Sequence, residues 1–323
     1  MTDAPLRAVR LPNQLQLAQL VDQAPEGDGW LHEQKFDGYR IIVHLEGRKL
    51  RLLSRRFNDW TAQFPTVVDA VAALPVKSVV LDGEVAVVMP DGRTSFQALQ
   101  NAFGQRGANI VYFVFDLLGL DGEDLTKLPL EDRKQRLATL IGSQHGVIRY
   151  SDHVVGNGEA FFELACKRGL EGIVSKKRDA PYSPGRGKSW LKTKCLLRQE
   201  FVIGGFTDPE GARTHIGALL VGYYERGALV YAGKVGTGFS GKDLVELKHA
   251  LAPLELPHSA FDPEPPRAWT GPNRHWVTPV LVAEVAFSEW TNEGRLRHPS
   301  FQGLRADKPA TEIVREHASH ANR

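Results

Sequence analysis

The chain has 323 residues, of which 24% are charged and 42% hydrophobic, and its net charge is +2. This length allows two domains that each bury a core, and the composition is that of an ordinary globular protein. The mild basic excess permits nucleic-acid binding but does not indicate it. No run approaches the roughly 18 apolar residues that cross a bilayer, which excludes a membrane-spanning helix.

The cysteines and the N-terminus bear on the cellular compartment. Cys166 and Cys195 are the two cysteines, too few for a metal cluster and without the spacing of one. We expect two reduced thiols in a cytoplasmic, nucleoid-associated protein, with a Cys166–Cys195 disulfide as the less favoured alternative. Residues 1–7 lack an apolar segment, so no signal peptide is predicted.

The first part of the chain alternates helices and strands irregularly. A helix is weakly predicted at residues 13–23. Stronger helix signals lie at 65–74, 96–103, 130–141 and 159–168, the third with its charged residues opposite its apolar face. Strands are predicted at 29–31, 40–45, 78–88, 110–118, 172–176 and 190–194. This interleaving favours an α+β domain over a parallel βαβ array.

The character of the sequence changes after about Arg198. Short strands are predicted at 200–206, 218–225, 228–234 and 280–290, with one clear helix at 242–251. Residues 257–279 contain several prolines and glycines, which predicts a loop. Several short strands in a small domain are typical of a barrel, and an oligonucleotide-binding (OB) fold is the natural candidate. We therefore expect two domains, residues 1–198 and 199–323.

The most informative local pattern is Glu-Gln-Lys-Phe-Asp-Gly-Tyr-Arg at residues 33–40. Its lysine, Lys35, lies beside a glycine turn between two predicted strands, where it is well placed to be exposed at the floor of a cleft. An acid and an arginine within five residues are groups that a phosphate-handling site needs. A solvated hairpin with a lysine on its rim is the alternative interpretation.

Charged residues spaced two apart form two pairs on predicted strands. Asp82 and Glu84 share one strand face, and Lys192 and Lys194 share another. Buried charges are costly unless they meet partners or a ligand, so both pairs are site candidates, and solvated edge strands are the alternative. Glu171, at the mouth of a strand, could ligate a hard cation through oxygen or could be an exposed loop residue.

Two aromatic residues, Phe113 and Phe115, share a face of the strand predicted at 110–118. A place in the core is the simpler interpretation, and an aromatic plate for a purine ring is the sharper one. The residues alone leave this choice open.

Taken in order, these patterns resemble the nucleotidyltransferase motifs of ATP-dependent DNA ligases. The motifs are Lys35-x-Asp37-Gly38-x-Arg40, Ser54-Arg55-Arg56, Asp82-Gly83-Glu84, Phe115-Asp116-Leu117-Leu118, Glu171-Gly172-Ile173-Val174 and Trp190-Leu191-Lys192-x-Lys194. Residues 295–301 and 305–308 look like the last motif. Residues 233–239 and 297–299 are most similar to the ligase module of bacterial end-joining enzymes, of the ligase D or ligase C type. The resemblance implies a nucleotidyltransferase domain followed by an OB-fold barrel.

The resemblance implies the chemistry of the first step. Lys35 would attack the α-phosphorus of ATP to form lysyl–AMP, which requires a lowered pKa or a metal complex because lysine is normally protonated. Lys192 and Lys194, beside the same phosphate, would disfavour the protonated form of Lys35 and stabilise charge on the phosphate oxygens. Asp37 would orient the nucleophile or a leaving oxygen.

The resemblance also implies how the nucleotide is held. Glu33 would meet the adenine amino group, Phe115 would stack on the ring, and Arg40 with Glu84 would reach the ribose. A divalent cation, Mg²⁺ or Mn²⁺, would lie between Glu171 and the phosphates, with Glu84 as the other ligand. Glu84 thus has two candidate duties, which the sequence does not divide.

Four further positions complete the implied site. Arg55 and Arg186 would belong to the nucleotide and nick-phosphate shell, with Arg186 in a mobile basic loop. Asp307 and Lys308 on the barrel would close over the nucleotide to align pyrophosphate and then swing away when DNA arrives.

The remaining steps and partners follow from the same resemblance. AMP would pass to a 5′-phosphate at a nick, and the neighbouring 3′-hydroxyl would displace it, both by in-line displacement. Duplex DNA with nicks or ends, bound mainly through its phosphates, would be the substrate in repair, recombination or replication. A bacterial Ku protein is a candidate partner, no membrane is involved, and the chain is expected to be a monomer.

Alternative functions remain open from the sequence. An mRNA-capping guanylyltransferase or an RNA ligase shares the lysine site, but not the Arg-His-Pro sequence at residues 297–299. A NAD-dependent ligase is disfavoured by the residues of the nucleotide-pocket motifs, and the lack of four zinc-binding cysteines agrees. A non-enzymatic OB-fold module that binds nucleic acid would need the barrel, but not Lys35, Glu171 or the lysine pair.

Overall fold

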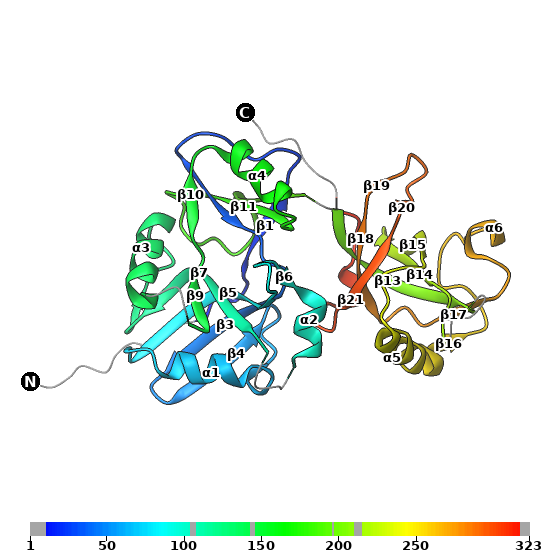
Figure 1. Ribbon diagram of the computed structural model, residues 1–323, viewed down its shortest axis with the longest axis horizontal. Helices are drawn as coiled ribbons and strands as arrows, with labels where there is room; N and C mark the ends of the chain where they lie inside the picture. The colour runs from blue at the N-terminus through cyan, green and yellow to red at the C-terminus, as the bar shows by residue number, and fades with distance from the viewer. Residues whose placement is uncertain (1–10, 104–107, 143–145, 196, 210–214, 317–323) are drawn as a thin grey trace, which may run out of the picture. The chain divides into compact units, whose positions relative to one another are not determined.

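The computed structural model describes residues 11–103, 108–142, 146–195, 197–209 and 215–316. They form two compact units, one running up to Cys195 and the other from Leu197 to Glu316. Figure 1 labels their elements. The stretch at residues 1–7, on which the signal-peptide prediction rests, lies outside the described residues. Within the described ranges, no helix is long and apolar enough to cross a membrane.

The first unit is built on two sheets. The five-stranded sheet has the order β1 (Gln16–Leu20), β12 (Gly185–Lys194), β11 (Gly172–Lys177), β2 (Trp30–Gln34) and β10 (His153–Val155). The path of the seven-stranded sheet is β4 (Lys49–Ser54), β3 (Tyr39–Glu46), β5 (Ser78–Val88), β7 (Ile110–Leu120) and β8 (Glu123–Asp124). Its remaining strands are β6 (Thr94–Ser95) beside β5 and β9 (Ile148–Tyr150) beside β7. Most pairs are antiparallel, whereas β1–β12 and β7–β9 are parallel.

Both faces of β3 are buried, which explains its unbroken apolar run. Ile41 and Val43 belong to a core that includes side chains of the helices α1 (Pro65–Ala72), α2 (Phe96–Asn101) and α3 (Leu130–Ile141). Ile42 points the other way, into a cluster that includes Trp190 of the five-stranded sheet. Alternate side chains of a strand face opposite sides, so β3 joins both cores.

The helices predicted from apolar spacing are confirmed, and α3 has the predicted bounds. The fourth helix is α4 (Gly158–Lys167). Two other predictions are wrong. Residues 13–23 contain β1 instead of a helix, and the expected loop around Arg186 is the beginning of β12. Each of these weak segments forms a strand because the other is available as its parallel partner.

Helix α3 departs from its predicted pattern because two of its charged residues are buried. Arg133 and Lys134 are 0% and 1% exposed. Arg133 donates two hydrogen bonds of 2.8 Å to the carboxylate of Asp116 on β7 and others to the carbonyl oxygens of Leu128 and Ala180. Figure 1 shows α3 beside β7 and β9, which lets these side chains reach inward.

The second unit is a curled sheet around the long strand β13 (Leu197–Thr207). Its neighbours are β14 (Leu219–Glu225), β17 (Arg274–Val277) and β18 (Val282–Phe287). The sheet continues through β15 (Ala228–Val235), β16 (Glu255–Leu256) and β21 (Ser300–Leu304), and β19 (Glu289–Trp290) pairs with β20 (Leu296–Arg297). A bridge from Thr237, just after β15, to Ser300 brings the two edges of the sheet together.

One helix of this unit was predicted and another was not. Helix α5 (Gly241–Leu251) follows a capping box in which Ser240 and Asp243 satisfy each other's backbone amides. Residues 257–279 are not only loop, because they contain the short helix α6 (Arg267–Thr270) and β17. β17 gains its hydrogen bonds from β13, a partner distant in sequence.

The cysteines form a disulfide, so the prediction of two reduced thiols is wrong. Cys166 lies in the last turn of α4 and Cys195 follows β12, and their Cα atoms are 5.1 Å apart. Because α4 packs against β11, and β12 is the neighbour of β11, the C-terminal end of α4 lies close to the C-terminal end of β12. The amide of Cys195 also donates to the carbonyl oxygen of Glu171 at 3.0 Å.

We expect Arg133→Met to destabilise the protein by about 3–5 kcal/mol, because it leaves Asp116 buried without its partner. Urea denaturation followed by circular dichroism measures this change in the free energy of unfolding. Arg136→Met is the matched control, since Arg136 pairs with Glu123 in solvent and such pairs contribute about 1 kcal/mol or less. Equal effects of the two variants would contradict the structural role of Arg133.

Candidate active site

Lys35 follows β2 directly and is anchored to β11. Its amide donates to the carbonyl oxygen of Gly172 at 3.0 Å, and Gly172 is in turn the register partner of Lys194 on β12. A Cβ at residue 172 would collide with the carbonyl oxygen of Thr193, so this position requires glycine. Side chains in register point to the same face of a sheet, and Lys35 and Lys194 therefore flank a gap.

A second row of the same sheet lies beside the first. Glu33 on β2, Val174 on β11 and Lys192 on β12 are in register. Since alternate residues share a face, Glu33, Lys35, Lys192 and Lys194 all lie on one side of the sheet. The structure thus brings the two predicted lysines to the face that carries Lys35.

The side chain of Lys35 forms an ion pair with Glu171 at 2.6 Å. Lys35 is 23% exposed in its side chain and Glu171 only 6%. Burial opposes the charge on Lys35, but the attraction of Glu171, helped by Glu84 and Asp37, raises the pKa of Lys35 above its ordinary value. The sequence predicted a pKa lowered by Lys192 and Lys194, and the direction in this structure is the opposite.

The turn after Lys35 is fixed by backbone contacts. Asp37 is buried; its amide donates to the hydroxyl of Thr94, and its carboxylate accepts from the amide of Phe96, the first residue of α2. A Cβ at Gly38 would collide with the carbonyl oxygen of Val85 on β5. These contacts hold the strand that leaves Lys35 against β5.

The two carboxylates on β5, Asp82 and Glu84, make different contacts. Asp82 is 0% exposed and binds Arg40 through two hydrogen bonds of 2.8 and 2.6 Å. The hydroxyl of Tyr182 also donates to Asp82, and Arg40 donates to the carbonyl oxygen of Gln16. Glu84 is in register with Arg40 and partly exposed. Asp82 is therefore the residue that orients Arg40, while Glu84 is one of the carboxylates that raise the pKa of Lys35.

Glu33 is the centre of a buried polar cluster that the sequence did not reveal. Its Oε1 accepts from Lys134 of α3 and Lys176 of β11, each at 2.9 Å, and its Oε2 accepts from the hydroxyl of Ser151 at 2.7 Å. Burial opposes the charge on Glu33, but the two lysines and the hydroxyl outweigh it and lower the pKa of Glu33. Burial lowers the pKa of Lys176 to about 8, with a further contribution from Lys134 against the attraction of Glu33.

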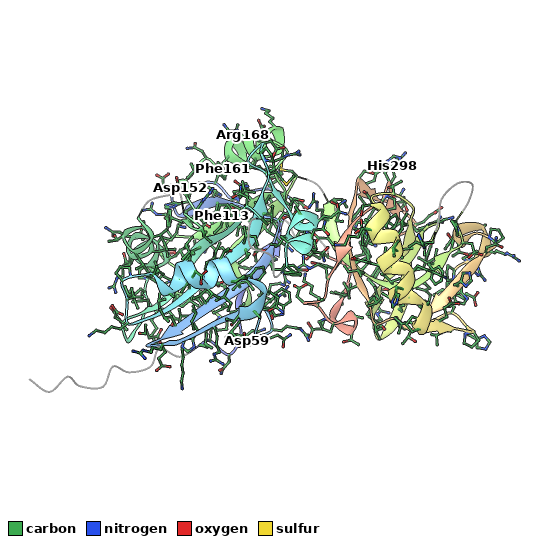
Figure 2. All side chains as sticks on the ribbon, turned by 60° about the horizontal axis from the view of Figure 1, so that its bottom comes forward. Asp59, Phe113, Asp152, Phe161, Arg168 and His298 are labelled. Carbon is green, nitrogen blue, oxygen red and sulfur yellow. A yellow bond between two sulfur atoms is a disulfide. The ribbon has the colours of Figure 1, made fainter. Side chains whose placement is uncertain are left out.

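Phe115 covers this cluster. The ammonium of Lys176 lies 4.3 Å from the centre of its ring, and Trp190 meets it edge to face at 5.8 Å. A register shift between β5 and β7 leaves Phe115 without a cross-strand partner. Phe113, labelled in Figure 2, instead stacks on Phe36 at 4.0 Å. The two phenylalanines therefore make different contacts, and Phe115 is the half-buried ring next to Glu33 and Lys176.

The two predicted arginines of the outer shell lie in the first unit as well. Arg55 is half-buried in the turn after β4. Arg186 is exposed on β12 and donates to the carbonyl oxygen of Ala18 at 2.5 Å. Arg186 is thus tied to strand β1 and does not lie in the basic loop that the sequence predicted.

Asp307 and Lys308 belong to the second unit and have partners there. Arg305 binds Asp307 through two hydrogen bonds of 2.8 Å, and Lys308 pairs with Glu200 of β13. Burial opposes the charge on Asp307, but Arg305 outweighs it and lowers the pKa of Asp307. Both predicted lid residues are therefore engaged within their own unit.

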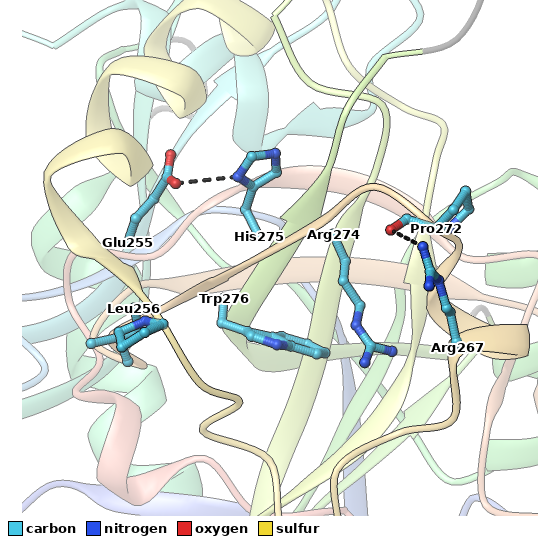
Figure 3. A pocket seen from close by; sticks show the side chains of 8 residues that line it. Glu255, Leu256, Arg267, Pro272, Arg274, His275 and Trp276 are labelled. Carbon is cyan, nitrogen blue, oxygen red and sulfur yellow. Dashed lines mark hydrogen bonds and ion pairs between the residues drawn. The ribbon is translucent and has the colours of Figure 1, made fainter.

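A hollow of about 360 Å³ lies in the second unit, lined by residues of β16, α6 and β17 (Figure 3). Of its charged residues, Arg274 binds Glu264 at 2.6 Å, His275 meets Glu255 at 3.2 Å, and Arg267 donates to the carbonyl oxygen of Pro272 at 3.1 Å. The residues that line the hollow include no lysine, and so no amine that could form a lysyl–AMP bond. We therefore place the chemistry at Lys35 and not in this hollow.

The described part of the chain holds no group of three or more histidine, cysteine or acidic side chains that could bind a metal by itself. A two-carboxylate site is nevertheless suited to Mg²⁺, which is commonly held by one or two carboxylates plus substrate phosphates. Glu171, whose oxygen already faces a cation in Lys35, fits this requirement together with Glu84.

Comparisons with known proteins agree with this geometry. The family model described as ATP dependent DNA ligase domain matches residues 15–194, and the ATP dependent DNA ligase C terminal region matches residues 212–308. The multifunctional non-homologous end joining protein LigD of Pseudomonas aeruginosa is 44% identical over 93% of this chain. LigD of Mycobacterium bovis is 42% identical over 89% of it. The chain spans 36% and 37% of these two relatives.

A solved structure extends the similarity to three dimensions. It is described as mycobacterial DNA ligase D complexed with ATP and MES, is 39% identical, and has a TM-score of 0.71. The match covers 94% of this chain and 98% of that one. The expected nucleotidyltransferase and OB-fold architecture is confirmed. With the catalytic model matching more than half of its length, the chain belongs to the family of ATP-dependent DNA ligases.

Proposed function

We propose that this chain is the ligase module of a bacterial end-joining protein and that Lys35 is its nucleophile. The observation that carries the proposal is the face shared by Lys35, Lys192 and Lys194, with Glu171 bound to the Lys35 ammonium. ATP is the adenylate donor of this family. Attack by Lys35 on the α-phosphorus forms lysyl–AMP and releases pyrophosphate.

The ion pair with Glu171 sets the condition for this step. While the pair is intact, Lys35 keeps its proton and cannot act as a nucleophile. A divalent cation, Mg²⁺ or Mn²⁺, held by Glu171 and Glu84 would neutralise phosphate charge. Without Glu171 as its partner, Lys35 would lose the main attraction that raises its pKa. Lys192 and Lys194 then stabilise the charge on the phosphate oxygens, and Asp37 keeps the turn of Lys35 in place.

We assign the nucleotide contacts to the buried cluster and its rim. Glu33 accepts from the adenine amino group, Lys176 donates to ring nitrogen N1, and Phe115 stacks on the base. Arg40, oriented by Asp82, reaches the ribose together with Glu84. The support for this assignment is the contact of Lys176 with both Glu33 and the Phe115 ring.

The later steps need DNA and the second unit. We assign the unit that runs up to Cys195 to adenylation and the unit that begins at Leu197 to the OB-fold domain, with Arg55 and Arg186 as phosphate contacts. Asp307 and Lys308 would align pyrophosphate, which requires their present pairs with Arg305 and Glu200 to open. AMP then passes to a 5′-phosphate, and the 3′-hydroxyl displaces it.

The biological setting is also a proposal. Because the LigD relatives are named for non-homologous end joining, we propose that this module seals nicks and broken ends in DNA repair. It would act as a monomer in the nucleoid, with a bacterial Ku protein as partner. Neither an RNA ligase nor a capping enzyme explains the match to both ligase family models.

Lys35→Ala should abolish transfer of label from α-labelled ATP to the denatured chain, because the attacking amine is gone. The measurement is autoradiography after incubation with a divalent cation. Lys167→Ala is the control, since its ammonium is exposed and pairs with Glu163 on the same helix. Label retained on the Lys35 variant would show that the nucleophile lies elsewhere.

Glu171→Gln should lower the pKa of Lys35, because it removes the carboxylate that raises it. Lys35 would therefore be neutral in a larger fraction of molecules at alkaline pH and react faster with an amine-directed acylating reagent. Mass spectrometry of the peptide that contains Lys35 measures this rate. The same variant should load less AMP through loss of a metal ligand, and a slower acylation of Lys35 would refute the ion-pair control.

Lys308→Ala should impair loading of AMP more than the sealing of a nick that already carries AMP, because pyrophosphate is aligned only in the first step. Rates of both reactions on the same preparation give the comparison. Lys242→Ala, an exposed helical position, should change neither rate. The reverse ranking of the two reactions would contradict the lid role.

A further inference from the structure

Helix α3 lies outside all the recognised motifs, yet it places two neighbouring cations in the interior of the first unit. Arg133 and Lys134 are buried, and buried charges are costly unless each is paired. Arg133 binds Asp116, the residue after Phe115, and Lys134 binds Glu33. Both partners adjoin the place assigned to the nucleobase, so side chains of α3 hold residues of that site in position.

The hydrogen bonds of Glu33 leave little freedom to its carboxylate. A carboxylate offers about four acceptor positions. Lys134 and Lys176 fill two on Oε1, and Ser151 fills one on Oε2. Lys134 also donates to the backbone carbonyl oxygen of Ser151 at 2.9 Å, which fixes it relative to that residue. One acceptor position on Oε2 is left, and its direction is set by these three bonds.

We propose that Lys134 and Ser151 are positioning residues that orient Glu33 to select adenine. This inference rests on the proposed function of Glu33 and Lys176 in base recognition. Within the described residues, the ammonium of Lys176 has one hydrogen-bond acceptor, Glu33, so it keeps donor capacity for a ligand. The oriented cluster therefore presents an acceptor on Glu33 beside a donor on Lys176.

This order of acceptor and donor matches adenine and opposes guanine. Adenine carries an amino donor at C6 next to the acceptor N1. Guanine and hypoxanthine carry an oxygen acceptor at C6 next to an N1–H donor, so each would meet a group of its own kind. A site built for one hydrogen-bonding order rejects the reverse because its polar groups would be left unpaired.

The charge of Lys176 makes nucleotide binding depend on pH, which gives a second way to test the proposal. The charged groups near it include Glu33 on β2, Lys134 on α3 and Asp116 on β7. Arg40 of β3, like Lys176, lies over the rings of Phe115 and Trp190. His153 on β10 is a further titratable group that interacts with Lys176. Lys176 loses its proton as the pH rises through about 8, and Lys134 is one cause of this low value. Without Lys134, the pKa of Lys176 rises.

The test compares Lys134→Met, Ser151→Ala and the matched control Arg136→Met in the full chain. Arg136 is on the same helix, but its charge is exposed and paired with Glu123. Self-labelling is measured with α-labelled ATP and with inosine triphosphate, whose base is hypoxanthine, from pH 7 to 9. Thermal denaturation confirms that each variant is folded.

We expect Lys134→Met to raise the KM for ATP about tenfold, the effect of one lost charge-assisted hydrogen bond. The maximal labelling rate should stay close to that of the parent protein, and the KM for inosine triphosphate should change little. The pH at which ATP binding weakens should move upward. Ser151→Ala should reduce the preference for ATP without moving that pH.

Two results separate the possible failures. If the parent protein takes no label from ATP, the proposed function itself fails. If the parent is labelled but both folded variants keep its ATP preference, and Lys134→Met keeps its pH profile, the positioning role is overturned. Should Lys134→Met not fold, an unchanged preference in Ser151→Ala overturns the role by itself.

Discussion

The ion pair between Lys35 and Glu171 is the interaction around which the first unit is organised. It joins the residue after β2 to the residue before β11, two neighbouring strands of the five-stranded sheet. Gly172, the next residue, allows β11 to lie against Thr193 of β12 on its other side. The pair keeps the lysine protonated, and the carboxylates of Asp37 and Glu84 also favour its charged form. An amine in this state does not react, so chemistry depends on a ligand that competes for Glu171.

Buried ion pairs hold the surrounding elements in register with this lysine. Asp82 orients Arg40, Asp116 binds Arg133, and Glu33 is held between two lysines. Buried pairs of this kind contribute little net stability, because desolvation offsets much of their attraction. They do restrict side-chain orientation, which is what a site that works by positioning and electrostatics requires. The second unit follows the same principle, with Asp307 bound to Arg305 and Lys308 bound to Glu200.

The sequence by itself determined the elements that have strong local periodicity and the order of the motifs. The helix at residues 130–141 and the strand at 78–88 have their predicted bounds, because apolar spacing fixes which face is buried. Lys35 could be singled out because its neighbours Asp37, Gly38 and Arg40 are local in sequence. The resemblance of these motifs to ATP-dependent DNA ligases was sufficient to predict the family.

Only the tertiary structure decided features whose partners are distant in the chain. Lys134, Ser151 and Lys176 meet Glu33 across sequence separations of 101, 118 and 143 residues. No spacing rule connects such positions, and Lys134 reads as an exposed helical residue until α3 is packed on the sheet. The disulfide and strand β1 were missed for the same reason, because a cysteine pair or a weak strand is defined by the neighbour that folding supplies.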